Sequence, residues 1–143
     1  MEQLFEVAEQ VGVEVMSTSL PESMTGIFIR SNEIEPVACL SHSIQGQLKM
    51  ERVTLATCIG SHIVLTDDTA YAPCYYDDYK KRLTASRQEY KRMRKAAEIL
   101  IDTNDLLDAI TSGLEEVWEL AEHFNVTEDF IALRLAVWEK SGR

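Results

Sequence analysis

The sequence predicts an α+β protein in which a small N-terminal β-sheet is followed by a helical bundle. The chain has 143 residues, which suits one domain and leaves no room for a second independent core. Between residues 13 and 49 the apolar runs are short and broken by proline and glycine, as in strands joined by turns. From residue 50 onward, apolar residues recur with helical spacing. We therefore expect a single domain over 1–143.

The N-terminal third supplies one helix and the sheet. A helix is predicted over 1–12, because apolar residues repeat every three to four positions and Gly12 follows the last of them. The small sheet is predicted over 13–49, where three short apolar runs are separated by turn residues. The three predicted strands are Val13–Met16, Gly26–Ile29 and Val37–Leu40.

The rest of the chain is predicted to be helical, apart from one connection. A buried helix is expected over 50–66, an exposed connection containing Pro73 over 66–79, and a long basic helix over 84–102. The C-terminal helices occupy 104–140, with Gly113 marking a break between two of them. Their predicted spans are Asn104–Ser112, Leu114–Phe124 and a last helix from Thr127.

Composition excludes several classes of protein. A net charge of -10 argues against general nucleic-acid binding, which needs a surplus of Lys and Arg. No apolar run approaches the roughly 20 residues that cross a bilayer, and the acidic N-terminus lacks the pattern of a secretion signal. Three widely spaced cysteines indicate reduced thiols. We expect a cytoplasmic protein without a membrane partner.

Positive charge gathers in one segment. Eight of the 14 Lys and Arg residues lie between Lys80 and Lys95. Such a run is typical of a solvated helix face, and it also suits a docking surface for an acidic partner. The candidate partner-binding residues are Arg87, Glu89, Lys91 and Arg94.

The segment 54–62 on the predicted buried helix carries the most informative motif. It reads TLATCIGSH and resembles the T-L-A-H-E-[IL]-G-H helix of the ImmA/IrrE metallopeptidases of phages and integrative elements. In that motif two histidines at i and i+4 bind zinc and the glutamate is the general base. The matching positions here are Thr57, Cys58 and Ser61. The resemblance therefore implies a zincin-like architecture with a degenerate motif and no catalytic residues.

Two further segments carry the same resemblance. The stretch from Glu89 to Ile101 is similar to the family's second signature, with Glu89 at the position of the third metal ligand. An alignment anchored on Ala96 and Ala97 puts Lys91 there instead, and Asp102 replaces the usual proline. The segment 119–130, ELAEHFNVTEDF, resembles the family's C-terminal helix pair. The resemblance spans about residues 12–135.

A rebuilt metal site is the main alternative to a lost one. Cys58 and His62 lie at i and i+4, and with Glu89 they offer a Cys/His/Glu set for zinc, to which Cys74 or His42 adds a fourth candidate. Their shared face is rotated by about 100° from the motif's own face. The simpler interpretation is a buried Cys58 and a half-exposed His62. A Cys58 nucleophile with His62 as its base has no further support in the sequence.

The C-terminal helices offer a third possibility. Their apolar spacing suits a helix-turn-helix, with Thr127 capping the second helix. The presumed recognition helix, however, begins with two acidic residues, and its first basic side chain is Arg134. A helical hairpin that packs on the core, with Trp118 and Trp138 as anchors, fits these residues better.

These observations lead to one expected function and two alternatives. Active relatives are thought to relieve repression of a mobile element by cleaving its repressor. The resemblance implies that a degenerate copy, itself phage- or element-encoded, engages a repressor or another host protein without cutting it and without a cofactor. The alternatives are a metallopeptidase with a rearranged zinc site and a DNA-binding regulator that uses the C-terminal helices.

Overall fold

The computed structural model describes residues 1–75 and 79–140, apart from the side chain of Lys80. Within this part of the chain, four strands form one sheet in the order β1-β3-β2-β4. The three predicted strands are confirmed, and β1 pairs parallel with β3 while β2 lies antiparallel to both β3 and β4. The bounds are β1 Glu14–Thr18, β2 Met24–Arg30, β3 Val37–Ser41 and β4 Ala70–Tyr75.

Strand β4 corrects the prediction of an exposed connection over 66–79, of which residues 76–78 lie outside the described residues. Buried and more exposed side chains alternate along β4, as expected for a half-buried strand. Pro73 hid this pattern, since proline lacks the N–H group that a sheet ladder needs. It is tolerated here because β4 is an edge strand and the Pro73 carbonyl points away from β2.

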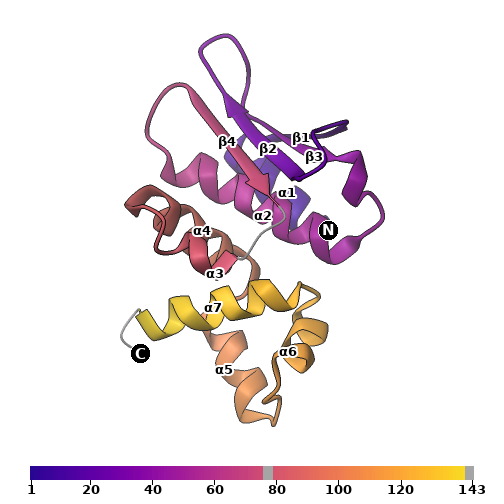
Figure 1. The fold of residues 1–143 in the computed structure, drawn as a ribbon, viewed down its shortest axis with the longest axis vertical. Helices are drawn as coiled ribbons and strands as arrows, with labels where there is room; N and C mark the ends of the chain where they lie inside the picture. Colours follow the sequence, from indigo (N-terminus) through magenta and orange to yellow (C-terminus); the bar gives the residue numbers. More distant parts are fainter. Residues whose placement is uncertain (76–78, 141–143) are drawn as a thin grey trace.

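Two helices cover one face of the sheet (Figure 1). They are α1 (Glu2–Val11) and α2 (Leu48–Val64), which pack on each other and on the strands. Gly12 ends α1 in the left-handed conformation, with φ of 80°, as the sequence predicts. A short 3-10 helix, η1 (His42–Ile44), precedes α2, which begins two residues before the predicted Met50.

The remaining helices follow along the long axis of the molecule (Figure 1). The predicted helix over 84–102 is shorter than expected, because Ser86 is extended and its hydroxyl caps the helix by accepting from the Glu89 N–H. The helix that spans Leu114–Phe124 in the prediction likewise begins later, after a capping box at Glu116. The observed helices are α3 Tyr79–Arg82, α4 Arg87–Leu100, α5 Thr103–Thr111, α6 Val117–Phe124 and α7 Glu128–Lys140.

The main core lies between the sheet, α2, α4 and α7. Phe28, Ile59 and Met93, from three different elements, are fully buried there with Phe130 from α7. Ile63 is an exception to the prediction of a buried helix over 50–66, because it is 43% exposed near the end of α2. The α+β class is confirmed, with three of the four described strands before α2 and a helical bundle after β4. Within the described residues, no helix is both long enough and apolar enough to cross a membrane.

Candidate functional site

The candidate site is built on α2, which runs between the sheet and α4. All side chains from Val53 to Ser61 are buried. Gly60 allows α4 to come close, because a Cβ added there would lie 3.1 Å from the Ala96 nitrogen and 3.2 Å from the Arg92 carbonyl oxygen. The close approach places the first half of α4 directly beside Thr57 and Ser61.

The two side chains at the positions of the family's histidines are bound to their own helix. The Thr57 hydroxyl donates to the Val53 carbonyl at 2.9 Å, and the Ser61 hydroxyl donates to the Thr57 carbonyl at 2.8 Å. Both residues are fully buried. This back-bonding satisfies short polar side chains inside a helix, and it turns both hydroxyl hydrogens toward the backbone of α2.

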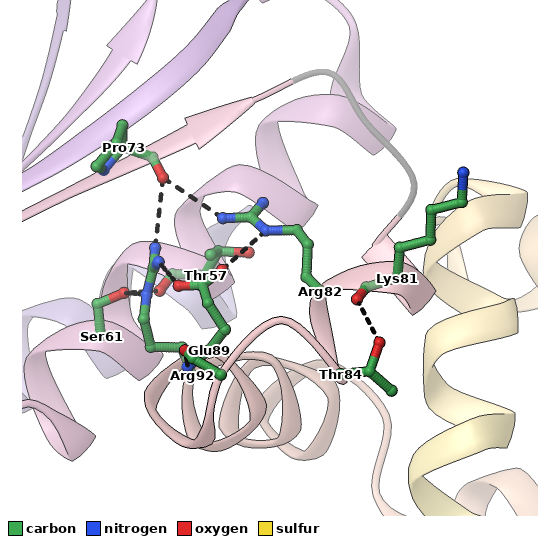
Figure 2. A network of polar contacts seen from close by, with 9 residues as sticks. Thr57, Ser61, Pro73, Lys81, Arg82, Thr84, Glu89 and Arg92 are labelled. Atoms are coloured by element: carbon green, nitrogen blue, oxygen red, sulfur yellow. Dashed lines mark hydrogen bonds and ion pairs between the residues drawn. The ribbon is translucent and has the colours of Figure 1, made fainter.

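Glu89 stands opposite these hydroxyls, held by two arginines (Figure 2). Its Oε2 accepts from Arg82 Nε at 3.0 Å, and its Oε1 forms an ion pair with Arg92 Nη1. Arg92 Nε also donates to the Ser61 hydroxyl at 2.7 Å. The Nη2 groups of both arginines point to the Pro73 carbonyl at 3.5 Å, the outer limit for a hydrogen bond. We call Arg82, Glu89 and Arg92 the ion triad.

The ion triad is largely removed from water. Its side chains are 10%, 23% and 6% exposed, in the order Arg82, Glu89, Arg92. Buried charges are tolerated when each is paired and hydrogen-bonded. The guanidinium of Arg92 meets both requirements, since it joins the carboxylate on α4 to the hydroxyl on α2.

The residues present do not fit a zinc ion. Zinc in proteins is held by thiolate, imidazole and carboxylate ligands, whereas Thr57 and Ser61 offer hydroxyl groups already bonded to the helix. The Glu89 carboxylate has a guanidinium on each oxygen. A divalent cation at this point would also face the positive charge of Arg82 and Arg92.

A groove of about 420 Å³ opens beside the ion triad, between β4 and α4. The triad and Gln88 line one side, while Tyr71, Pro73 and Tyr75 line the other. Tyr71 is 71% exposed. The groove therefore combines aromatic rings with buried cationic groups, a combination that suits a partner with both apolar and anionic groups.

Cys58 points away from the ion triad and toward the sheet. Its sulfur lies 4.0 Å from the sulfur of Cys74 on β4, and both residues are fully buried. The hydrogen bond with Cys74, together with burial, raises the pKa of the Cys58 thiol well above its ordinary value. The same hydrogen bond and the charges of Arg92 and Arg82 lower the pKa of Cys74 against the effect of burial.

His62 joins α1, α2 and β2. Its Nε2 lies 3.0 Å from the Val11 carbonyl and its Nδ1 lies 3.1 Å from an Arg30 guanidinium nitrogen. The two partners fix one tautomer, in which Nε2 donates and Nδ1 accepts. Burial lowers the pKa of His62, and the Arg30 charge lowers it further, against the hydrogen bond to Val11. The expectation of a half-exposed His62 is confirmed.

Of the alternative zinc ligands, Cys58 and Cys74 come together, but His62, Glu89 and His42 do not join them. Cys58 contacts Cys74, His62 contacts Val11 and Arg30, and Glu89 is held by the arginines. His42 lies elsewhere, beside Ser19. Among the residues that the structure describes, no group of three or more His, Cys, Asp or Glu side chains is placed to hold a metal ion.

The basic segment divides into two parts. Arg87, Lys91 and Arg94 are exposed on α4, where Arg94 pairs with Glu98. We call these three residues the exposed basic face. Arg82 and Arg92 instead turn inward, so for these two the interpretation as a solvated face is wrong. The sequence left either Glu89 or Lys91 at the position of the family's third metal ligand. Because Lys91 is exposed, Glu89 is the one of the two that faces α2. The side chain of Lys80 lies outside the described residues.

The C-terminal helices pack on the rest of the molecule. Helix α7 contacts α3, α4 and α6, and its Arg134 is 1% exposed, donating to the Ile101 carbonyl and the Thr103 hydroxyl. Arg134 therefore cannot contact a DNA phosphate, as the DNA-binding alternative would require of the recognition helix. Of the two predicted anchors, Trp138 packs against the core, whereas Trp118 is 59% exposed and is not one.

Sequence analysis missed three participants in the site. They are Arg82, Arg92 and the carbonyl of Pro73. The spacing of Arg92 three residues after Glu89 was a usable signal, since i and i+3 are neighbours on a helix. Nothing in the sequence marked Arg82 or Pro73, whose roles depend on the position of β4.

Together the fold and the place of α2 define an α+β domain of metallopeptidase type. The chain belongs to the IrrE N-terminal-like domain family (Peptidase_M78), whose model matches residues 8–136. The match covers the sheet, α2 and the helices as far as α7, and it confirms the family resemblance of the sequence motifs. No curated protein matches the chain.

Proposed function

We propose that this chain is a non-catalytic member of its family that acts by binding a protein, without zinc and without peptide cleavage. Following the role implied for active relatives, its partner is a repressor or another host protein, and the chain is encoded by a phage or mobile element. The single observation that carries the proposal is the ion triad, in which guanidinium groups take both oxygens of the Glu89 carboxylate.

The chemistry of the site supports the loss of catalysis. The family's general base is a carboxylate on the motif helix, and its position here is Cys58, whose sulfur faces Cys74. A buried thiol with a raised pKa cannot take a proton from water at neutral pH. Arg92 supplies the positive charge that balances Glu89 and Arg82 adds a second one, so the carboxylate needs no metal ion for charge balance.

The exposed surface supports binding. The groove and the exposed basic face lie on neighbouring parts of α4. Their positive charge stands out in a chain with a net charge of -10. An acidic partner would therefore be drawn to this side of the molecule and away from the rest.

Zinc binding by chelator-treated protein tests the catalytic half of the proposal. After incubation with zinc and removal of free metal, elemental analysis should find far less than one zinc per chain. The variant Thr57→His, Cys58→Glu, Ser61→His, Arg92→Ala is the positive control, because it restores the motif on the same helix and frees one oxygen of Glu89. Circular dichroism should first establish that this variant folds.

The opposite result is equally clear. One zinc per wild-type chain, lost in a Cys58→Ala, His62→Ala double variant, would mean a rebuilt metal site and would end the proposal. The same samples should then be mixed with candidate repressors to look for cleavage that a chelator stops.

Charge reversal tests the binding half. A variant with Arg87→Glu, Lys91→Glu and Arg94→Glu should bind a repressor encoded beside this gene at least about tenfold more weakly, because rim charges steer and hold a charged partner. Lys49→Glu is the matched control, since Lys49 is a surface cation on α2, paired with Glu122. Equal affinities for wild type and the triple variant would exclude the exposed basic face as the docking surface.

A further inference from the structure

The buried contact between Cys58 and Cys74 has a structural cause in Gly26. Gly26 is the partner of Cys74 in the ladder between β2 and β4, and a Cβ at Gly26 would lie 2.5 Å from the Thr54 methyl carbon. The missing side chain lets α2 lie close to the sheet at this point. Cys58 follows Thr54 by one helical turn, so it faces the same strands and meets Cys74.

The two sulfurs are close enough to become a bonded pair. Their separation of 4.0 Å must shrink to about 2.05 Å in a disulfide, a change that requires side-chain rotation and a small shift between α2 and β4. Cys39, the third thiol, packs with Ile27 and Val37 in a separate apolar cluster. The geometry therefore singles out one pair among the three cysteines.

The charges near Cys74 favour its thiolate form, although the side chain is fully buried. Arg92 and Arg82 lie near enough for their charges to lower the pKa of its thiol, as does the hydrogen bond from Cys58. Cys74 stands between Pro73 and Tyr75, which both line the groove. Because side chains alternate along a strand, the Cys74 thiol lies on the opposite face of β4 from the Pro73 and Tyr75 side chains, where it faces Cys58 on α2.

We propose that Cys58 and Cys74 form a redox-sensitive pair, converted to an intramolecular disulfide by a small hydroperoxide. The Cys74 thiolate attacks the peroxide oxygen, which yields a sulfenic acid and releases an alcohol, or water from hydrogen peroxide. The Cys58 sulfur then attacks the Cys74 sulfur, the S–O bond breaks, and water leaves. Two thiols are oxidised to one disulfide while the hydroperoxide is reduced by two electrons.

The disulfide would tie the motif helix to the edge strand beneath the groove. It links α2, which carries Thr57 and Ser61, to β4, whose Pro73 carbonyl faces the two arginines. Oxidation should therefore stiffen the groove wall and stabilise the fold. This inference does not depend on the proposed binding function, since it concerns a buried pair and not the exposed basic face.

Thiol counting with hydrogen peroxide tests the proposal directly. Reduced wild-type protein is treated with the peroxide under native conditions, then denatured, alkylated and analysed by mass spectrometry. We expect the loss of two hydrogen atoms, alkylation at Cys39 alone, and one linked peptide containing Cys58 and Cys74 that dithiothreitol separates. The melting temperature should rise by about 5–10 °C on oxidation.

Three variants make the result specific. Cys39→Ser should form the same disulfide with the same rise in melting temperature. Cys58→Ala should form none and should instead accumulate a sulfenic acid at Cys74 that dimedone traps, and Cys74→Ala should form neither product. Three alkylated thiols in treated wild type, a disulfide that includes Cys39, or a Cys58–Cys74 link that appears only in urea would each overturn the proposal.

Discussion

Helix α4 carries the same kind of residue on two faces with opposite surroundings. On its inner face Arg92 is 6% exposed, bonded to Glu89 and Ser61. On its outer face Arg94 is 47% exposed and pairs with Glu98, which is itself 42% exposed. The inner arginine lies where the family's motif would place a metal site. The outer one lies in the exposed basic face.

The difference shows how position decides what a charge does. A guanidinium beside a carboxylate in water contributes little, because solvent and salt screen the pair. Between packed helices the same two groups form a buried ion pair. Removing one partner leaves the charge of the other buried and unpaired. We therefore assign the inner ion pairs to the stability of the site, while the outer charges form the docking surface that we propose.

The largest effect is expected from Glu89→Ala. This change leaves Arg82 and Arg92 facing each other without their shared carboxylate, so the free energy of unfolding should fall by about 3–5 kcal/mol. Urea denaturation followed by circular dichroism measures it. The matched control is Glu98→Ala on the same helix, which should lower the free energy of unfolding by at most about 1 kcal/mol. Equal effects of the two changes would abolish the distinction between the faces.

The inner face also depends on close packing, which Gly26→Ala tests. The added Cβ would lie 2.8 Å from the Cys39 carbonyl oxygen as well as against Thr54. We expect the free energy of unfolding to fall by about 1–3 kcal/mol because the helix must move from the sheet. Adding Thr54→Ser removes the methyl group in the way and should restore part of the loss in the same assay. No loss in the single variant would show that α2 shifts freely.

A smaller effect is expected from pH through His62. Because its pKa is lowered in the folded protein, chiefly by burial, the unfolded chain binds the proton more readily. The associated stability is complete above the unfolded pKa of about 6.5 and is lost as the pH falls toward the folded value. Denaturation midpoints between neutral and mildly acidic pH should therefore drop less in His62→Gln than in wild type. The exposed His42→Gln is the control and should follow wild type.

Most of the architecture could be predicted from sequence, because it follows from local patterns. The strands and helices that repeat apolar residues regularly were found, with errors of a few residues where a cap such as Ser86 decided the start. Strand β4 was missed because Pro73 argues against a strand unless the edge of the sheet is known. The edge position of β4 depends on tertiary structure, so residues 70–75 alone do not reveal it.

Likewise, only some of the residues of the site could be predicted from the sequence. The motif on α2 identified Thr57, Cys58 and Ser61 from sequence alone. The roles of Arg82 and Arg92 were hidden, because a run of basic residues reads alike whether its members face water or a carboxylate. The contact between Cys58 and Cys74 likewise depends on β4, which brings together two residues that no local pattern connects.

The smallest effect on stability is expected on the exposed basic face. Arg87→Glu and Lys91→Glu should each change the free energy of unfolding by at most about 0.5 kcal/mol, since both side chains are exposed on α4. Urea denaturation of the two single variants and of Glu89→Ala gives free energies of unfolding that compare the two faces of α4 directly. A loss of several kcal/mol in either variant would show that the outer charges also maintain the fold. With folding unchanged, any loss of partner affinity in these variants can be attributed to the surface itself, which makes the outer face the informative place to test binding.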